Sequence, residues 1–344
     1  MDIKSKYPLI SHNTFGIKAT ADWWVSFHSL EDLDRLARDE YFLSQPYLVI
    51  GEGSNLLFLE DYHGVIMHSE IKDLEVISDI SHTLSKDEIL VRVGSGVVWD
   101  DFVAWSLDQG FYGAENLSWI PGNIGAAAVQ NIGAYGSEIA QLVESVETFD
   151  LETRSSRIFS QEECRYAYRY SIFKDPKASR YIVTHVVLKL SSKANVNLSY
   201  KALRDYLGNK RDISPKEVRA AVIAIRKEKL PDPKELPNAG SFFMNPVVAL
   251  DVYQKLQEQY PEMPHYEAPN GVKLSAAWLL DHAGLKGYAV GHVATYKHQP
   301  LILVNRGEAT GKEVALFAKE LIGKVKEHFG VELRPEVRYI GKDC

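Results

Sequence analysis

The sequence predicts a protein of the α+β class with two or three domains. Short apolar runs typical of strands alternate along the chain with helical periodicities, and neither type fills a region alone. The 344 residues exceed what one ordinary hydrophobic core contains. With 45% apolar and 25% charged residues, the composition is that of a soluble globular protein.

Charge, cysteine content and hydropathy exclude several classes of function. The net charge of −7 disfavours a general nucleic-acid or anionic-membrane partner, but it is compatible with a small polyanion held by local Lys and Arg. Cys164 and Cys344 lie too far apart in sequence to indicate a disulfide framework, so a reducing cytoplasm fits best. The N-terminus lacks a signal-peptide core, and no window reaches the roughly 18 apolar residues of a membrane span. The eleven histidines lack metal-ligand spacing, so we expect no metal site.

The first of three regions carries a β-α-β pattern. Trp23–Phe27 and Tyr47–Ile50 are predicted strands, with one helix near Leu30–Phe42 between them. In the second region, Ile89–Val93 and Tyr181–Lys189 are predicted strands. A helix is also predicted there from about Val98 to Gln109, and Gly110 suits its left-handed cap.

The third region opens on a capping box at Ser214–Glu217, with Pro215 at the first helical position. The helix is expected to stop before Pro231, and apolar residues follow its start at helical spacing: Val218, Ala221, Val222 and Ile225. A second capping box, Thr310 to Glu313, predicts a helix to about Phe329. The stretch from Leu198 to Ile213 is the predicted linker between the second and third regions.

Two segments of small residues are candidate ligand-binding loops. Ile120 to Gly136, IPGNIGAAAVQNIGAYG, would let a large flat or phosphorylated ligand lie against the backbone. It is not G-x-G-x-x-G, and close packing between elements is the alternative. GEGSN, Gly51 to Asn55, follows the strand YLVI and offers a nest of backbone donors, although a plain strand-ending turn is also possible. The two loops together suggest one large dinucleotide, and neither has a GK[ST] ending.

Four side chains are candidates for chemistry. Arg169, in YAYRYSIFK, suits bidentate carboxylate recognition, with stacking on tyrosines as the alternative. Ser241, in NAGSFFMNP, lacks a nucleophile elbow but could donate a proton, or be a turn serine. Lys229 could reach a phosphate or complement its helix dipole. Glu336, in RPEVRYIG, is either a proton carrier or an exposed strand-edge residue.

Taken as a set, these motifs resemble the UDP-N-acetylenolpyruvoylglucosamine reductases of bacterial peptidoglycan synthesis. The resemblance runs almost from end to end. It includes NTFG at Asn13 to Gly16, GEGSNLLF, ENLSWIPGNIGAAAVQNIGAYG, YRYSIFK, KLPDPK, NAGSFFMNPVV and PEVRYIG, in that order.

The resemblance implies an FAD-binding fold of the vanillyl-alcohol-oxidase type with a C-terminal α+β substrate-binding domain. Residues 1–68 would form the first FAD-binding subdomain, 69–212 the second and 213–330 the substrate domain, with 331–344 packing back near the active site. Non-covalent FAD would be held by Gly51, Glu52, Gly53, Ser54, Asn55, Ile120, Pro121, Gly122, Asn123, Ile124, Gly125, Ala126, Gly133, Ala134 and Tyr135.

The implied reaction is the reduction of UDP-N-acetylglucosamine enolpyruvate to UDP-N-acetylmuramate by NADPH through FAD. Arg169 would stabilise charge on the enolpyruvyl carboxylate, Ser241 would donate a proton to C2, and Glu336 would support and polarise the site. The substrate would contact Tyr200, Lys229, Asn245, Tyr266, Lys286 and Gln299. Tyr200 further suggests the subtype in which a tyrosine loop closes over the substrate.

This sequence departs from the family pattern at few positions. Met244 stands where many relatives have Lys, so phosphate contact from that position is lost, and Ala126 and Ala127 replace Gly or Ser. The resemblance implies a cytoplasmic bacterial enzyme, a monomer, acting in cell-wall biogenesis and so in cell shape and division. Two alternatives remain: an oxygen-using FAD carbohydrate oxidase of the same fold, and a non-catalytic nucleotide-sugar-binding protein.

Overall fold

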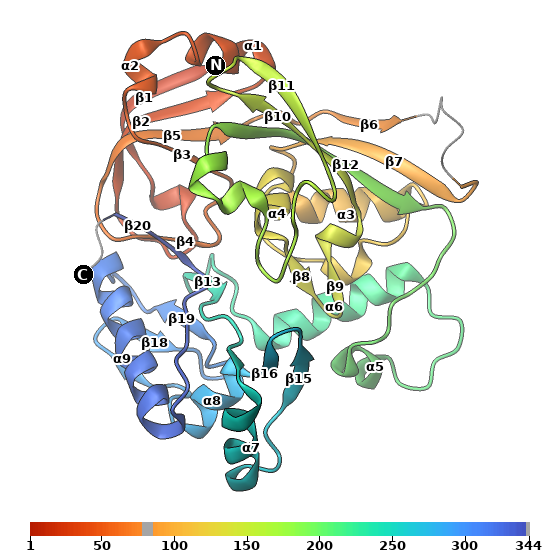
Figure 1. The fold of residues 1–344 in the computed structure, drawn as a ribbon, viewed down its shortest axis with the longest axis vertical. Coiled ribbons are helices and arrows are strands. Elements are labelled where there is room, and N and C mark those ends of the chain that lie inside the picture. The colour runs from red at the N-terminus through yellow and green to blue at the C-terminus, as the bar shows by residue number, and fades with distance from the viewer. Residues whose placement is uncertain (78–84, 342–344) are drawn as a thin grey trace. The chain divides into compact units, whose positions relative to one another are not determined.

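The computed structural model describes residues 1–77 and 85–341 and divides into two compact units. The first unit contains Met1–Tyr7, Ala21–Glu52 and His63–Lys227, and the second contains Pro8–Thr20, Gly53–Tyr62 and Glu228–Cys344. Two short segments near the N-terminus, 8–20 and 53–62, therefore belong to the second unit, and the rest of that unit is the continuous stretch from residue 228 onward (Figure 1).

The first unit begins with a four-stranded sheet of order β1-β2-β5-β3, in which β3 runs parallel to β5. Its strands are β1 Asp2–Pro8, β2 Thr20–Phe27, β3 Tyr47–Ile50 and β5 Tyr62–Ser69. Between β2 and β3, the prediction of one helix over Leu30–Phe42 is wrong. The chain forms α1 Leu30–Leu36 and α2 Glu40–Leu43, because the Asp39 side chain accepts the N–H of Tyr41 and caps a new helix.

A five-stranded antiparallel sheet, in the order β11-β10-β12-β7-β6, forms the rest of the first unit's framework. Its strands are β6 Leu74–Ile77, β7 Glu88–Gly94, β10 Val143–Asp150, β11 Ser155–Ser160 and β12 Tyr181–Ser191. Helices α3 Trp99–Asp108 and α4 Ile124–Gln130 pack on it (Figure 1) through Trp99, Phe102, Ala128, Val93 and Val186, all buried. Each such large apolar side chain contributes about 1.5–3 kcal/mol when fully buried.

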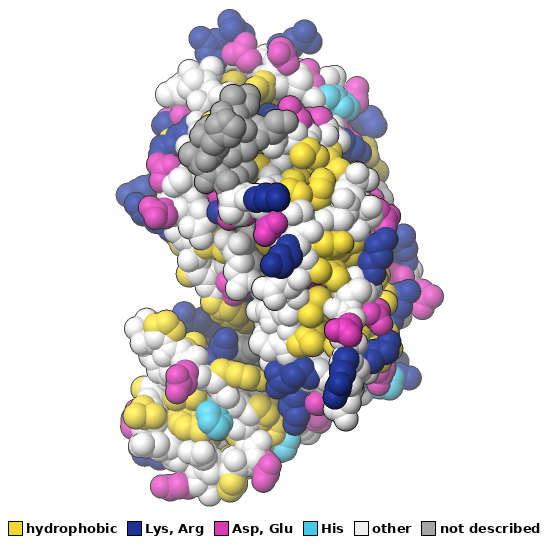
Figure 2. Space-filling view, turned by 90° about the vertical axis from the view of Figure 1, so that its right-hand side faces the viewer, with side chains coloured by type: hydrophobic (Ala, Val, Ile, Leu, Met, Phe, Trp, Pro, Cys, Tyr) yellow, Lys and Arg dark blue, Asp and Glu magenta, His cyan; other side chains and the backbone are white. Residues whose placement is uncertain are grey.

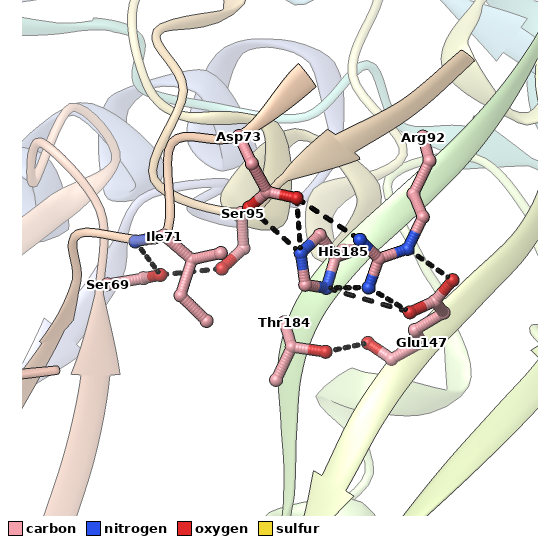
Figure 3. Close-up of polar contacts among 8 residues, drawn as sticks. All are labelled: Ser69, Ile71, Asp73, Arg92, Ser95, Glu147, Thr184 and His185. Atoms are coloured by element: carbon pink, nitrogen blue, oxygen red, sulfur yellow. Dashed lines mark hydrogen bonds and ion pairs between the residues drawn. The ribbon is translucent and has the colours of Figure 1, made fainter. Parts of the chain in front are cut away.

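The other face of this sheet carries a polar cluster, because successive side chains alternate between faces (Figure 3). Arg92 donates to Glu147 at 2.7 Å, and the Nε2 atom of His185 lies 3.1 Å from Asp73. The hydrogen bond and charge of Glu147 raise the pKa of Arg92. These side chains come from the three adjacent strands β7, β10 and β12 and from the residue before β6, so they tie the strands together on this face.

Ser69 and Ser95 lie beside this cluster (Figure 3), and the backbone of Ser95 contacts the start of α4. The hydroxyls of Ser69 and Ser95 are 2.7 Å apart, and the backbone N–H of Ser95 donates to Thr184 on β12. The carbonyl of Ser95 accepts the N–H of Gly125 at 3.0 Å. The start of α4 is therefore fixed to the sheet by the backbone.

Helices α5 Lys201–Leu207 and α6 Pro215–Lys229 complete the first unit. The prediction of a linker over Leu198–Ile213 is wrong in part, because fully buried Leu203 of α5 packs with Val218 and Val222 of α6. The predicted capping box is confirmed: Ser214 accepts the N–H of Glu217, and Glu217 accepts that of Ser214.

The second unit contains a four-stranded sheet, a three-stranded sheet and a two-stranded parallel pair. The first has the order β13 Asn238–Ser241, β19 Ile302–Asn305, β18 Val293–Thr295 and β17 Ala289–Val290. The second has the order β14 Val247–Val248, β16 Gly271–Leu274 and β15 His265–Ala268, and the pair joins β4 Leu56–Phe58 to β20 Arg338–Ile340. The helices are α7 Leu250–Gln259, α8 Ala276–His282 and α9 Gly311–Phe329. The capping box of α9 at Thr310 is as predicted.

The remaining short elements lie in connections. They are the 3-10 turns η1 Ile10–His12, η2 Glu115–Leu117, η3 Ile139–Gln141, η4 Ile172–Lys174 and η5 Pro176–Ala178, and the strands β8 Gly133–Ala134 and β9 Ser137–Glu138. Across the described ranges, no helix combines the length and apolar character needed to cross a bilayer. On the face in Figure 2, Lys and Arg are interspersed with Asp and Glu.

Candidate functional site

The two small-residue loops come together in the first unit. A side-chain oxygen of Glu52 accepts the backbone N–H of Gly122 at 2.9 Å. A Cβ atom on Gly51 would lie only 2.6 Å from Oδ1 of Asn123 and 3.2 Å from Cβ of Ala126. A larger residue at position 51 would force the Asn123 side chain to move, so glycine there allows the close approach of the two segments.

The loop before α4 contains a polar atom that has no partner. Asn123 donates from Nδ2 to the carbonyl of Gly96 at 3.0 Å, and the neighbouring Ile124 N–H donates to Val97 at 2.9 Å. Within the described residues, the buried Oδ1 of Asn123 accepts no hydrogen bond. Buried polar atoms are normally satisfied, so this oxygen beside Gly51 suits a ligand donor.

Backbone strain is concentrated in the glycine-rich segment and just before it. Trp119, Asn131 and Tyr135 all have left-handed backbones, with φ of 58°, 47° and 50°. Such conformations cost of order 1–3 kcal/mol each and persist where surrounding contacts impose them. Asp100 supplies one such contact, since it accepts the N–H of Trp119 and is paired with Arg219.

Arg226 is a site residue that the sequence argument missed. Its guanidinium lies 5.9 Å from the centroid of the Trp119 ring, and its buried Nε has no partner in the described part of the chain. Burial lowers the pKa of this guanidinium, an effect opposed by the charges of Tyr135 and Asp100. The sequence does contain an indication of this residue. Arg226 follows buried Val222 by one helical turn, which places an arginine on the apolar face of α6.

Arg169 is held against the glycine-rich segment. It donates from Nη2 to the carbonyl of Gly133 at 3.1 Å, and its guanidinium also lies 5.2 Å from the centroid of the Tyr168 ring. Arg169 therefore stacks on a tyrosine, which was the alternative interpretation, and also contacts the glycine-rich segment. Nearby, the ring of Tyr200 packs edge-on at 5.2 Å against Tyr135.

Ser241 and Glu336 are brought together in the second unit by backbone pairing. The N–H of Glu336 donates to the carbonyl of Phe242 at 2.8 Å, and Phe243 forms a bridge with Pro335. Phe242 and Phe243 are buried, as expected of an apolar wall, while Ser241 is exposed. The predicted tight turn is present at Gly240, whose φ is +67°.

Asn55, the last residue of GEGSN, contacts the backbone around Glu336. The amide of Asn55 donates to the carbonyl of Glu336 at 3.3 Å, and the carbonyl of Asn55 accepts the N–H of Arg338 at 3.0 Å. A Cβ on Gly53 would lie 1.9 Å from the carbonyl oxygen of His12, so this position also requires glycine. Part of the loop assigned to FAD is therefore hydrogen-bonded to the chain beside Glu336.

The other expected substrate residues lie at separate points of the second unit. Lys229 ends α6, and Asn245 accepts the N–H of Ala276 at the start of α8. Tyr266 is exposed on β15, Lys286 is paired with Asp281 at 3.0 Å, and Gln299 accepts the N–H of Leu301. Arg169 and Tyr200 belong to the first unit, so the candidate residues are divided between the units.

The described residues include no group of three or more His, Cys, Asp or Glu side chains arranged to hold a metal ion. An organic cofactor fits the first unit better. Gly51 leaves room beside the unpaired oxygen of Asn123, and elsewhere in the same unit the buried Nε of Arg226 also lacks a partner among the described residues.

Comparison with known proteins identifies the class. Residues 21–154 match the family model described as an FAD binding domain. A solved structure of a solvent-stable cholesterol oxidase superposes with a TM-score of 0.50 over 97% of this chain and 86% of that chain, at 12% identity, which shows the fold alone. The chain therefore contains an FAD-binding domain, and the protein is an FAD-dependent oxidoreductase.

More specific matches identify the family. Residues 232–340 match the UDP-N-acetylenolpyruvoylglucosamine reductase C-terminal domain. The reductase of that name from Porphyromonas gingivalis W83 is 50% identical over 99% of this chain and 100% of its own, and that of Bacteroides fragilis YCH46 is 45% identical over 98% and 100%. The crystal structure of the Thermus caldophilus enzyme superposes with a TM-score of 0.66 at 25% identity, over 99% of this chain and 98% of that chain. The chain belongs to the UDP-N-acetylenolpyruvoylglucosamine reductase family.

Proposed function

We propose that this enzyme reduces UDP-N-acetylglucosamine enolpyruvate to UDP-N-acetylmuramate, with NADPH as the reductant, in peptidoglycan precursor synthesis. The observation that carries the proposal is 50% identity, over the full length, to a relative that bears the reductase name. The backbone hydrogen bond from Glu336 to Phe242, the residue after Ser241, supports it independently because it brings the segments of both candidate residues together. The expected surroundings are the bacterial cytoplasm, and the expected state is a monomer.

The first unit would hold the cofactor. When bound, FAD accepts hydride from NADPH and passes it to the substrate. Gly51 and Glu52 with the segment 120–126 would lie against the dinucleotide, with Asn123 Oδ1 available to accept a hydrogen bond. Arg226 would offer its unpaired Nε–H to an electron-rich cofactor atom, since a buried donor without a partner is costly.

Three side chains would carry the chemistry on the substrate. An enol ether accepts hydride at C3 only if the charge that develops on C2 and the conjugated carboxylate is stabilised, and the fixed fork of Arg169 suits that carboxylate. The enolate must then gain a proton at C2, which the exposed hydroxyl of Ser241 would donate. Glu336, one hydrogen bond from the backbone beside Ser241, would polarise the same site.

The substrate diphosphate would take its donors mainly from the second unit, through Lys229, Asn245, Tyr266, Lys286 and Gln299. Lys286 would then exchange or share its ion pair with Asp281. Tyr200, 44% exposed and packed on Tyr135, would close over the substrate as in the tyrosine-loop subtype.

Anaerobic half-reactions test the proposal. Purified protein is expected to be yellow, to bleach with NADPH, and to regain its visible spectrum rapidly with the enolpyruvyl substrate but slowly with air. Rapid reoxidation by oxygen and not by the substrate would instead indicate a carbohydrate oxidase. Protein that is colourless, or yellow but not bleached by NADPH, would indicate a non-catalytic binding protein.

A further inference from the structure

The turn that presents Arg169 has an unusual backbone. Ala167 and Tyr170 exchange two backbone hydrogen bonds, of 3.0 and 2.9 Å, so Tyr168 and Arg169 form the tip of a two-residue hairpin. Arg169 itself has φ of +55°, in the left-handed region that residues with a Cβ atom disfavour. Some contact must hold the backbone in this conformation for the guanidinium to lie where it does.

Both ends of the hairpin are attached to the C-terminal end of α4. The amide of Asn131 donates to the carbonyl of Ala167 at 2.8 Å, and the hydroxyl of Ser171 donates to the carbonyl of Val129 at 2.7 Å. Asn131 and Ser171 are fully buried. These contacts fix the base of the hairpin to the glycine-rich segment, but they act on the residues that flank the tip.

Lys174 acts on the tip. Its ammonium donates to the carbonyl of Arg169 at 2.9 Å and to the side-chain carbonyl of Gln130 at 3.0 Å. One cation therefore bridges the backbone of Arg169 to the last residue of α4. The hydrogen bond is charge-assisted, which makes it stronger than a neutral one, and it fixes the orientation of the peptide that follows the left-handed residue.

We propose that Lys174 is the positioning residue for Arg169. It stabilises the left-handed turn and so holds the guanidinium at a fixed position beside the glycine-rich segment, where it would meet the substrate carboxylate. The inference rests on the proposed function of Arg169. Without Lys174, the carbonyl of the peptide after Arg169 loses its charge-assisted hydrogen bond, while the N–H of the same peptide still donates to Ala167. The left-handed φ of Arg169 is then less firmly held, so the guanidinium would move away from the carbonyl of Gly133. A displacement of about 1 Å in a positioned group can cost on the order of 10²-fold in rate.

Lys174→Met tests the assignment, with Lys174→Arg as the conservative variant and Lys177→Met as the matched control. Both lysines are exposed, so none of the three variants leaves a cavity or a buried charge. In stopped-flow half-reactions, we expect Lys174→Met to slow flavin reoxidation by the enolpyruvyl substrate by about 10- to 100-fold. Flavin reduction by NADPH, FAD content and melting temperature should match the wild type. Lys174→Arg should recover most of the rate, and Lys177→Met should lose none.

A double-mutant cycle separates positioning from general support. If Lys174 acts through Arg169, Lys174→Met should cause no further slowing in an Arg169→Ala background. Additive losses, equal losses in both half-reactions, or an unchanged rate in Lys174→Met would each overturn the inference. Failure of the wild-type protein to be reoxidised by the substrate would overturn the proposed function itself, and the inference with it.

Discussion

In the first unit, the segments assigned to FAD are shaped by backbone and by absent side chains, whereas in the second unit the assigned catalytic groups are side chains carried on paired backbone. Gly51 and Gly125 each lie so close to a neighbour that a Cβ would collide with it. Ser241 is exposed, and its place depends on the hydrogen bonds of the adjacent residue. We therefore expect that enlarging a side chain in the FAD segments of the first unit should weaken folding and cofactor binding. Shortening a candidate catalytic side chain in the second unit should instead slow the reaction.

The largest effect is expected from trimming Ser241. Ser241→Ala removes the hydroxyl of an exposed residue, so FAD binding and flavin reduction by NADPH should persist. Reoxidation by substrate should fall by about 10²–10⁴-fold because the proton donor is lost, and Glu336→Gln should show the same asymmetry. Anaerobic stopped-flow spectroscopy measures both steps. Equal losses in the two half-reactions would place Ser241 in cofactor binding or folding instead.

A smaller effect is expected from enlarging Gly125. Neither Gly125 nor Gly323 of α9 has a positive φ, so the two differ mainly in their surroundings. A Cβ on Gly125 would lie 2.8 Å from Cβ of Ser95, whereas nothing lies within 4 Å of one on Gly323. Gly125→Ala should lower the free energy of unfolding by about 1–3 kcal/mol through overpacking and weaken FAD binding.

Gly323→Ala is the matched control for that prediction. It should raise the free energy of unfolding by about 0.5–1 kcal/mol, because alanine favours a helix over glycine and here meets no neighbour. Urea denaturation and FAD titration measure both variants. If the two substitutions have the same effect, the close contact at Ser95 is not what makes the first unit sensitive.

The smallest effect is a loss of stability at alkaline pH. It is expected from Cys164, a residue of the first unit. Burial raises the pKa of the Cys164 thiol, which lies in the core of the first unit, from 9.0 to about 12. Above pH 9 the unfolded chain loses this proton while the folded chain keeps it, so the contribution to stability is complete below pH 9 and is lost as pH rises towards 12. By pH 10 the loss should be about 1 kcal/mol. Urea midpoints at pH 7.5 and 10 should differ less in Cys164→Ala than in the wild type.

Sequence motifs predicted the class and the family, because glycine requirements leave a direct mark on a sequence. Gly53 is needed for a left-handed backbone and a close contact with His12, and capping boxes such as Thr310 to Glu313 define a helix start locally. The prediction of a loop over Ile120 to Gly136 is wrong in part, because Ile124–Gln130 forms α4. The predicted residue assignments for FAD and substrate are compatible with the geometry and await the half-reaction experiments. The three-region domain division also remains a prediction.

Predictions from the sequence were wrong where the preference of a single residue outweighed the average pattern of the segment around it. Apolar periodicity continues from Leu30 to Phe42, but one aspartate, Asp39, is a better helix start than a helix interior. Leu198–Ile213 was expected to be a linker, yet buried Leu203 and partly buried Leu207 pack α5 onto α6. Arg226 was missed because an arginine in an amphipathic helix is usually solvated, and only the fold shows which neighbours surround it.

The parallel pairing of β4 with β20 has a consequence for synthesis of the chain. Asn55 and Glu336, which it brings together, are 281 residues apart in sequence. Closing so long a loop before its contacts form is slow and entropically costly. During translation, residues 53–62 leave the ribosome long before their partners exist, while most of the first unit can already fold. The part of the second unit that holds Glu336 is therefore completed last, so a stalled or truncated chain would be released with residues 53–62 still lacking their partner strand.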